Sequence, residues 1–129
     1  MEAAQRYLEA KERYTVGSKT WAKATAAAFN MLTQKACAEV AKPEWWNDEG
    51  LKVTSVRVVR AAPNDLVAIQ MRAAVLCGIC GGAWVAGPRS VAELMEAATH
   101  YERAAALCPA PAAKASLAGK AGWCRRQAE

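Results

Sequence analysis

Cys77 and Cys80 form the clearest chemical motif in the sequence, a C-x-x-C pair. Such a pair can cycle between dithiol and disulfide when its first thiol lies at a helix N-terminus, which lowers the thiol pKa. Here the pair falls at the end of a helix expected over residues 66–77 or 66–80, where the helix dipole disfavours a thiolate. A structural role is therefore favoured, and thiol redox chemistry remains an alternative.

Metal binding is a second alternative, because two cysteines are half of a zinc site. Cys108, Cys124 or His100 could complete such a site, but their spacing matches no zinc finger or ribbon. The single histidine has no serine or cysteine partner implied by spacing, so we interpret it as a surface helix residue. The sequence thus predicts no enzyme, no catalytic residue, no metal and no cofactor.

Composition favours helices over sheets. The chain has 129 residues, of which 53% are hydrophobic, and alanine, the best helix former, supplies much of that fraction. We expect one all-α domain spanning residues 1–129. Residues 1–14 lack a secretory signal and the cysteine count is odd, which indicates reduced thiols in the cytoplasm, with the nucleus as an alternative. The uncharged stretch 73–88 is too short and too glycine-rich for a membrane span.

One segment, residues 96–109, shows how the helices should pack. Ala97, Tyr101 and Ala104 lie on one helix face, where two small residues flank a large one, and Pro109 ends the helix. Pro111 then suits the first turn of a following helix over 112–127. The stripe recurs as Ala3, Tyr7 and Ala10 in a first helix expected to end near residue 14.

Capping residues and prolines place the remaining helices. Ser18 begins a helix expected to run to residue 40 or 41, and Asn47 and Ser90 are further candidate caps. The segment 51–62 is ambiguous, because Val53–Val59 has strand propensity. Its proline, Pro63, lies 46 positions before Pro109, and this repeat context makes helix the prediction.

The repeat of about 46 residues, within the range of solenoid proteins, resembles the tetratricopeptide repeat. The residues that carry the resemblance are Trp21, the pairs Ile69 with Ala73 and Ala115 with Gly119, and the set Ala97, Tyr101, Ala104 and Pro109. It implies antiparallel helix hairpins stacked as a short right-handed α-solenoid of about six helices, which could continue in a longer array.

Four features depart from the family pattern. The link between first and second helices is about a dozen residues longer than the family norm, and Thr25 stands where a small residue is usual. Arg72 replaces a leucine, and Ser55 occupies the aromatic place. A related α-solenoid and an unrelated helical bundle therefore stay open.

The resemblance implies a concave face, lined by the first helix of each unit, that holds a peptide or a partner helix. Carried over position by position, the expected groove consists of Lys19, Phe29, Asn30, Val67, Gln70, Ser116, Lys120 and Trp123. The net charge of +5 resides largely on two of these helices, which favours a protein or acidic peptide as partner. A solvated lysine face is the plainer interpretation of that charge.

Three further expectations concern partners. No dense basic run or known module points to nucleic acid, and no segment points to a membrane. The apolar terminal helices could mediate self-association, which would make the chain a structural subunit of a larger helical assembly. The adjacent Trp45 and Trp46 either fill the space between helix pairs or form a hot spot for a partner, and Trp84 in the equivalent loop favours the first.

Overall fold

The computed structural model describes residues 6, 8–9, 13–34, 41–78 and 83–129. Within these ranges the regular structure is entirely helical, which confirms the all-α prediction. The helices are α2 (Lys19–Leu32), α3 (Asp48–Ala61), α4 (Leu66–Cys77), α5 (Val91–Leu107) and α6 (Pro111–Ala128).

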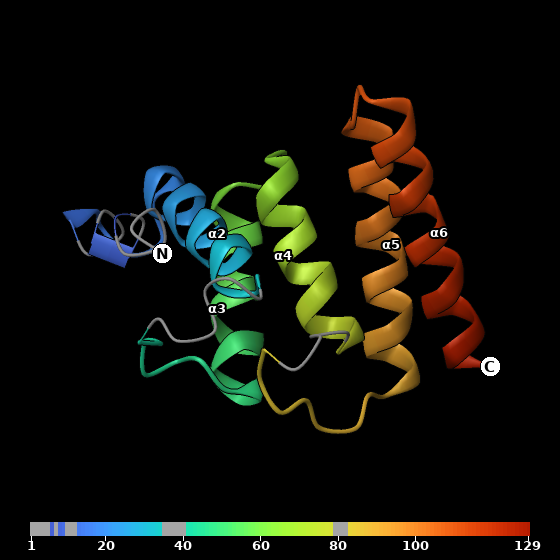
Figure 1. The fold of residues 1–129 in the computed structure, drawn as a ribbon, viewed down its shortest axis with the longest axis horizontal. Helices are drawn as coiled ribbons and strands as arrows, with labels where there is room; N and C mark the ends of the chain where they lie inside the picture. Colours follow the sequence, from blue (N-terminus) through green and yellow to red (C-terminus); the bar gives the residue numbers. More distant parts are fainter. Residues whose placement is uncertain (1–5, 7, 10–12, 35–40, 79–82) are drawn as a thin grey trace.

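The five helices follow one another across the molecule in the order of the sequence (Figure 1). Helices α2 and α3 lie at one side, α4 occupies the middle, and α5 and α6 lie side by side at the other. Each helix packs against the next one in the chain, and α2 also packs against α4. Short connections after α3 and α5 make the α3–α4 and α5–α6 pairs antiparallel.

Side-chain caps explain where the helices begin. The Ser18 and Asn47 side chains accept hydrogen bonds from the backbone amides of Trp21 and Gly50, as predicted. Ser90 caps α5 and forms a reciprocal capping box with Glu93, so this predicted cap is also confirmed. Helix α6 begins with Pro111, whose missing amide hydrogen is not needed in the first turn.

The segment 51–62, which the sequence left between strand and helix, is helical as far as Ala61 and forms most of α3, as predicted. Leu51, Ser55 and Val58 are buried on one face of α3, at helical spacing. The Asn47 cap, together with Asp48 and Glu49 in the first turn, favours helix at the N-terminus of this segment. Packing of one face and capping together outweigh the strand propensity of the valines.

The expected end of one helix differs from the structure. Helix α2 ends at Leu32, whereas a helix to residue 40 or 41 was expected, so that prediction is wrong at Thr33 and Gln34, which are not helical. Thr33 closes the helix, where its hydroxyl donates to the Asn30 carbonyl at 2.8 Å. Residues 35–40, and most of the helix expected over residues 1–14, lie outside the described residues.

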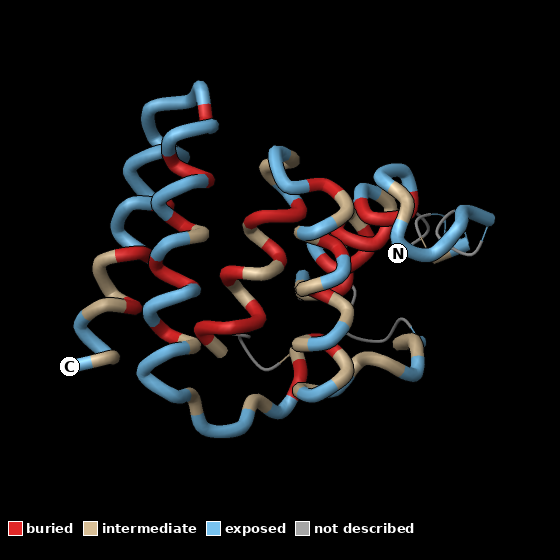
Figure 2. Tube along the Cα trace, turned by 180° about the vertical axis from the view of Figure 1, so that it is seen from behind, coloured by how far each residue is buried: buried red, intermediate tan, exposed pale blue. Residues whose placement is uncertain are grey.

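Helix α4 is shared between two hydrophobic clusters. One face buries Ala68, Met71 and Val75 against α2 and α3. The opposite face contributes Ile69, Ala73, Leu76 and Cys77 to a cluster with α5 and α6. Buried residues accordingly lie on the helix faces that are turned toward one another, whereas residues 111–116, the first turns of α6, are exposed (Figure 2). Helix α4 therefore connects the two hydrophobic clusters.

Arg72 of α4 and Ser55 of α3 contact one another. The Arg72 guanidinium donates to the Ser55 hydroxyl at 3.1 Å and to the Lys52 carbonyl at 2.9 Å. Its Nε also donates to Glu96 of α5 at 3.1 Å. The Arg72 guanidinium thus satisfies the hydroxyl of the buried Ser55.

Thr25 offers a test in which a substitution stabilises the protein. Its side chain is fully buried in α2, and within the described structure its hydroxyl oxygen has no hydrogen-bond partner. Replacing Thr25 with valine removes an unsatisfied polar group and keeps the branched shape. We expect the free energy of unfolding in urea to rise by about 1 kcal/mol. The exposed Thr20→Val on the same helix is the control, and a loss of stability in Thr25→Val would contradict the interpretation.

Candidate functional site

A hollow of about 200 Å³ lies between α2, α4 and the last helix, and we call it the α2–α4 groove. It is lined by Phe29, Asn30 and Thr33 from α2 and its cap, Val67, Gln70, Met71 and Ala74 from α4, Trp84 from the loop before α5, Tyr101 from α5, and Lys120 from α6. The exposed side chains of Asn30, Val67 and Lys120 make it accessible from solvent.

Packing of α2 and α4 decides which side chains face the groove. Phe29 is buried against the first cluster, and this orientation directs the adjacent Asn30 outward. On α4, both buried faces are occupied by core contacts, so Val67, Gln70 and Ala74 lie between them and remain partly exposed. The groove is thus lined by side chains of α2 and α4 that the core leaves partly exposed, together with the buried Phe29 and Met71.

Aromatic side chains form one end of the groove. The Phe29 ring centroid lies 5.5 Å from that of Trp46 and 5.9 Å from that of Trp84. Trp46 and Trp84 meet edge to face at 6.1 Å, and the Trp46 indole donates to the Ala83 carbonyl at 2.9 Å. Trp46 and Trp84 thus pack with Phe29 between the helices, and Trp45 lies 5.9 Å from Trp46, partly buried against the same cluster.

An ion pair holds the loop that carries Trp84. The Arg89 guanidinium donates two hydrogen bonds to the Asp48 carboxylate, at 2.6 and 2.9 Å. Asp48 also accepts from the Trp84 indole and the Gly87 amide, each at 3.1 Å. Arg89 reaches further, to the Val75 carbonyl at 2.9 Å. The loop is therefore fastened to the start of α3 and the end of α4, which fixes the position of the Trp84 ring.

The groove is mildly electropositive. Of the described side chains that line it, Lys120 alone carries a charge at neutral pH. Its ammonium lies 5.9 Å from the centroid of the Tyr101 ring, within the range of a cation–π interaction. Burial, together with the neighbouring Cys77 thiol, raises the pKa of Tyr101, so the phenol stays neutral.

The structure gathers five of the eight residues expected in the groove. Phe29, Asn30, Val67, Gln70 and Lys120 line it together. The residues not anticipated there include Thr33, Met71, Trp84 and Tyr101. Trp84 is a large aromatic residue between glycine-rich and proline-containing segments, and that isolation is the signal that could have assigned it.

The other three expected residues lie elsewhere. Lys19 lines a separate hollow at the α3–α4 turn and does not line the α2–α4 groove. Ser116 is exposed on the first half of α6. Trp123 is half-buried and packs against the cluster of α4, α5 and α6.

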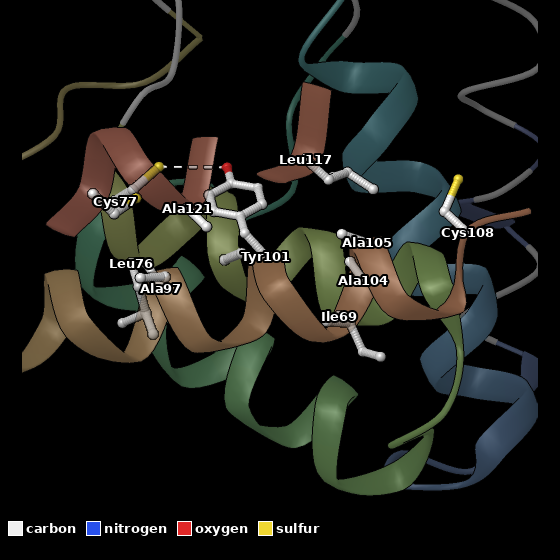
Figure 3. Packing of buried hydrophobic residues seen from close by; sticks show 13 residues of the cluster. Ile69, Leu76, Cys77, Ala97, Tyr101, Ala104, Ala105, Cys108, Leu117 and Ala121 are labelled. Carbon is white, nitrogen blue, oxygen red and sulfur yellow. Dashed lines mark hydrogen bonds between the residues drawn. The ribbon is translucent and has the colours of Figure 1, made fainter. Parts of the chain in front are cut away.

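Cys77 has the surroundings of a structural cysteine. It is buried, its thiol lies 3.5 Å from the Tyr101 hydroxyl, and it donates to the Ala74 carbonyl at 3.3 Å (Figure 3). Burial also raises the pKa of the nearby Cys124 thiol to about 11, with Cys77 adding to the shift. At neutral pH the Cys124 thiol is therefore protonated and weakly nucleophilic. Cys80, the other member of the motif, lies outside the described residues.

No site for a metal appears in the part of the chain that the structure describes, because nowhere there do three histidine, cysteine or acidic side chains come together. His100 instead lies 3.1 Å from Glu96, which is held by Arg72. Among the same residues, no helix is both long and apolar enough to cross a bilayer.

Comparison with known proteins adds no assignment to this geometry: no protein-family model, curated protein or solved structure matches the chain.

Proposed function

We propose that this chain is a protein-interaction module that binds an acidic peptide segment, or the acidic face of a partner helix, in the α2–α4 groove. The observation that carries the proposal is the convergence of α2, α4 and α6 on one hollow. That hollow has two amide side chains, an aromatic end, one lysine and no acidic lining residue.

Each part of the groove suits a peptide. The Asn30 and Gln70 amides can each donate to and accept from a peptide backbone. The aromatic end formed by Phe29 and Trp84 suits one apolar side chain. Lys120 can pair with a carboxylate, and its exposure keeps that pairing modest. The small volume implies that a partner buries about one side chain here and spreads over the flanks.

The finer architecture belongs to this proposal. We propose that the helices form a tetratricopeptide-like stack, a short right-handed α-solenoid in which α2, α4 and α6 are first helices. Packing of every helix on its sequence neighbour, together with the α2–α4 contact, supports this arrangement. Three free, buried cysteines support a reducing compartment such as the cytoplasm.

A charge reversal at Lys120 tests the groove. We expect Lys120→Glu to weaken binding of an acidic peptide, selected from a peptide library, by about tenfold or more, because attraction becomes repulsion. Binding is followed by fluorescence anisotropy of the labelled peptide. NMR shifts of the Asn30 and Gln70 side-chain amides report whether the peptide lies in the groove.

Lys114→Glu is the matched control, because it makes the same charge change on the same helix, on an exposed residue that does not line the groove. This variant should lower the affinity for the peptide by less than about threefold, as expected for a screened surface charge. Equal losses in the two variants, or binding that leaves both amides unshifted, would show that the groove is not the site.

A structural subunit of a larger helical assembly is the second candidate, and the first turns of α6 favour it. Residues 111–116 are all exposed there, and Leu107 beside them is 45% exposed. A neighbouring helix could cover this surface. Sedimentation velocity over a wide range of protein concentration tests it, since self-association requires a sedimentation coefficient that rises with concentration.

The third candidate, redox or metal chemistry at the Cys77 and Cys80 pair, has weaker support. The Cys77 thiol is only 4% exposed and is already hydrogen-bonded within the core. Titration of the folded protein with a thiol reagent separates this candidate from the others, since it requires two rapidly reacting thiols.

A further inference from the structure

A second hollow lies at the turn between α3 and α4. It borders the N-terminal end of α2, whereas the groove residues Phe29 and Asn30 lie near the C-terminal end of that helix. We call it the turn hollow. It encloses about 280 Å³ and is lined by Lys19, Lys23 and residues 61–65. Ala61, Ala62 and Pro63 give it an apolar floor, and Asn64 and Asp65 add polar atoms. It shares no lining residue with the α2–α4 groove.

The two lysines on its wall lie one helical turn apart. Lys19 and Lys23 are at i and i+4 on α2, so their ammonium groups share one face and repel each other. Within the described residues neither makes an ion pair, whereas Lys52, Arg89 and Arg125 each contact a carboxylate. An anion placed between them would relieve the repulsion and gain two attractive interactions.

The polar atoms at the turn already have defined roles. The Arg103 guanidinium donates to Asn64 Oδ1 at 2.6 Å, which leaves the Asn64 NH₂ group available as a donor. Asp65 Oδ2 accepts from the Ala68 amide at 3.0 Å as the cap of α4, so its other oxygen can accept from a hydroxyl. The hollow thus presents two cations, one amide donor and one carboxylate acceptor above an apolar floor.

We propose that the turn hollow binds a compact phosphate ester that carries hydroxyl groups, with the chemistry of a sugar phosphate or a nucleoside monophosphate. The phosphate lies between Lys19 and Lys23, Asn64 donates to a phosphate or ring oxygen, and Asp65 accepts from a sugar hydroxyl. The volume lies just below the range typical of small-molecule sites, which restricts the ligand to a compact one.

A small ligand fits these observations better than a nucleic acid strand. Recognition of a strand needs cations spaced along an open surface, and base stacking on exposed aromatic rings. The turn hollow has its two lysines on one helix face, and no aromatic side chain lines it. Its Asp65 carboxylate would repel a neighbouring phosphodiester but can accept from a sugar hydroxyl.

Titration of the full chain with ribose 5-phosphate tests the proposal. The readout is the NMR chemical shift of the backbone amides of Ala62, Asn64 and Asp65. We expect these three to shift together and to saturate, inorganic phosphate to produce smaller shifts of the same resonances, and ribose alone to produce none. Lys19→Gln combined with Lys23→Gln should lower the affinity for the sugar phosphate by about tenfold or more, because two charge-assisted contacts are lost.

The double variant Lys114→Gln with Arg126→Gln is the matched control, since it removes the same charge from exposed positions on α6. It should change the affinity by less than about twofold. Equal losses in the two double variants, or unshifted turn resonances, would overturn the proposal. The proposal would also be overturned if a single-stranded oligonucleotide bound more tightly than ribose 5-phosphate and if Arg60→Gln and Arg103→Gln weakened that binding. This result would indicate a nucleic acid ligand instead. Lys120→Glu should leave this binding unchanged, so the turn hollow and the groove succeed or fail separately.

Discussion

Replacing Arg89 with methionine is expected to lower the free energy of unfolding by about 3 kcal/mol, because it removes one partner of a largely buried ion pair. The Arg89 side chain is 6% exposed and that of Asp48 is 15% exposed. Without the guanidinium, the Asp48 carboxylate keeps the Trp84 and Gly87 donors and the Lys52 ammonium at 3.9 Å, but it loses the cation that contacts both of its oxygens. The Val75 and Gly87 carbonyls also lose a donor. Methionine retains the apolar stem, so the loss reports mainly on the charged contacts.

Urea denaturation of both proteins gives this difference, and Arg57→Met is the control. Arg57 lies exposed on α3, and its replacement should change stability by no more than about 0.5 kcal/mol. A comparable, small effect at both positions would mean that the Asp48–Arg89 contact does not fasten the loop.

The pH dependence provides a second check on the same pair. The Arg89 hydrogen bonds hold the pKa of Asp48 far below its ordinary value of 3.8. A depressed pKa in the folded protein stabilises it fully above that ordinary value, and the contribution is lost as pH falls toward the folded pKa. The stability difference between wild type and Arg89→Met should therefore shrink as pH is lowered from about 6 to about 2. A difference that is constant over this range would contradict the assignment.

This ion pair also shows where the sequence stops being informative. Asn47 and the acids after it indicated a capped helix start, and that local signal was sufficient to predict α3. Asp48 and Arg89 are 41 positions apart, and each has a plausible solvated role when considered alone. Only the path of the loop after α4 brings them together, and local patterns do not determine that path.

Local signals predicted most helix boundaries because each has a short-range physical cause. Ser18 and Ser90 cap helices through side-chain hydrogen bonds, and Pro109 and Pro111 separate α5 from α6 by their missing amide hydrogens. The end of α2 was missed because no proline or glycine follows Leu32, and the Thr33 hydroxyl bond that closes the helix has no distinctive sequence pattern.

The groove residues were carried over from the tetratricopeptide resemblance, position by position. Asn30, Val67 and Gln70 do line the hollow, at partly or fully exposed positions of α2 and α4. Lys19 lies at the other end of α2, which is long enough for its two ends to border different hollows. Trp84 could not be placed by periodicity, since it lies in a loop whose position depends on Arg89 and Asp48.

Tyr101→Ala is expected to lower the free energy of unfolding by about 4 kcal/mol, because it empties the space between three helices. The side chain is 4% exposed and belongs to the cluster of α4, α5 and α6. Its ring lies between the alanines of α5 and the last helix, with the hydroxyl directed at Cys77 (Figure 3). The small flanking residues Ala97 and Ala104 cannot expand to fill the cavity, so relaxation recovers little of the loss.

Tyr101→Phe separates the ring from its hydroxyl. It keeps the packing and removes only the contact with the Cys77 thiol, so the expected loss is about 1 kcal/mol or less. Leu107→Ala, on the exposed end of the same helix, controls for general effects on α5. If Tyr101→Ala and Tyr101→Phe differ by less than about 1 kcal/mol in urea denaturation, the aromatic ring does not hold α4, α5 and α6 together. The small-large-small stripe would then describe helix spacing without accounting for stability, and the association of α6 would have to depend on Leu117 and Ala121 instead.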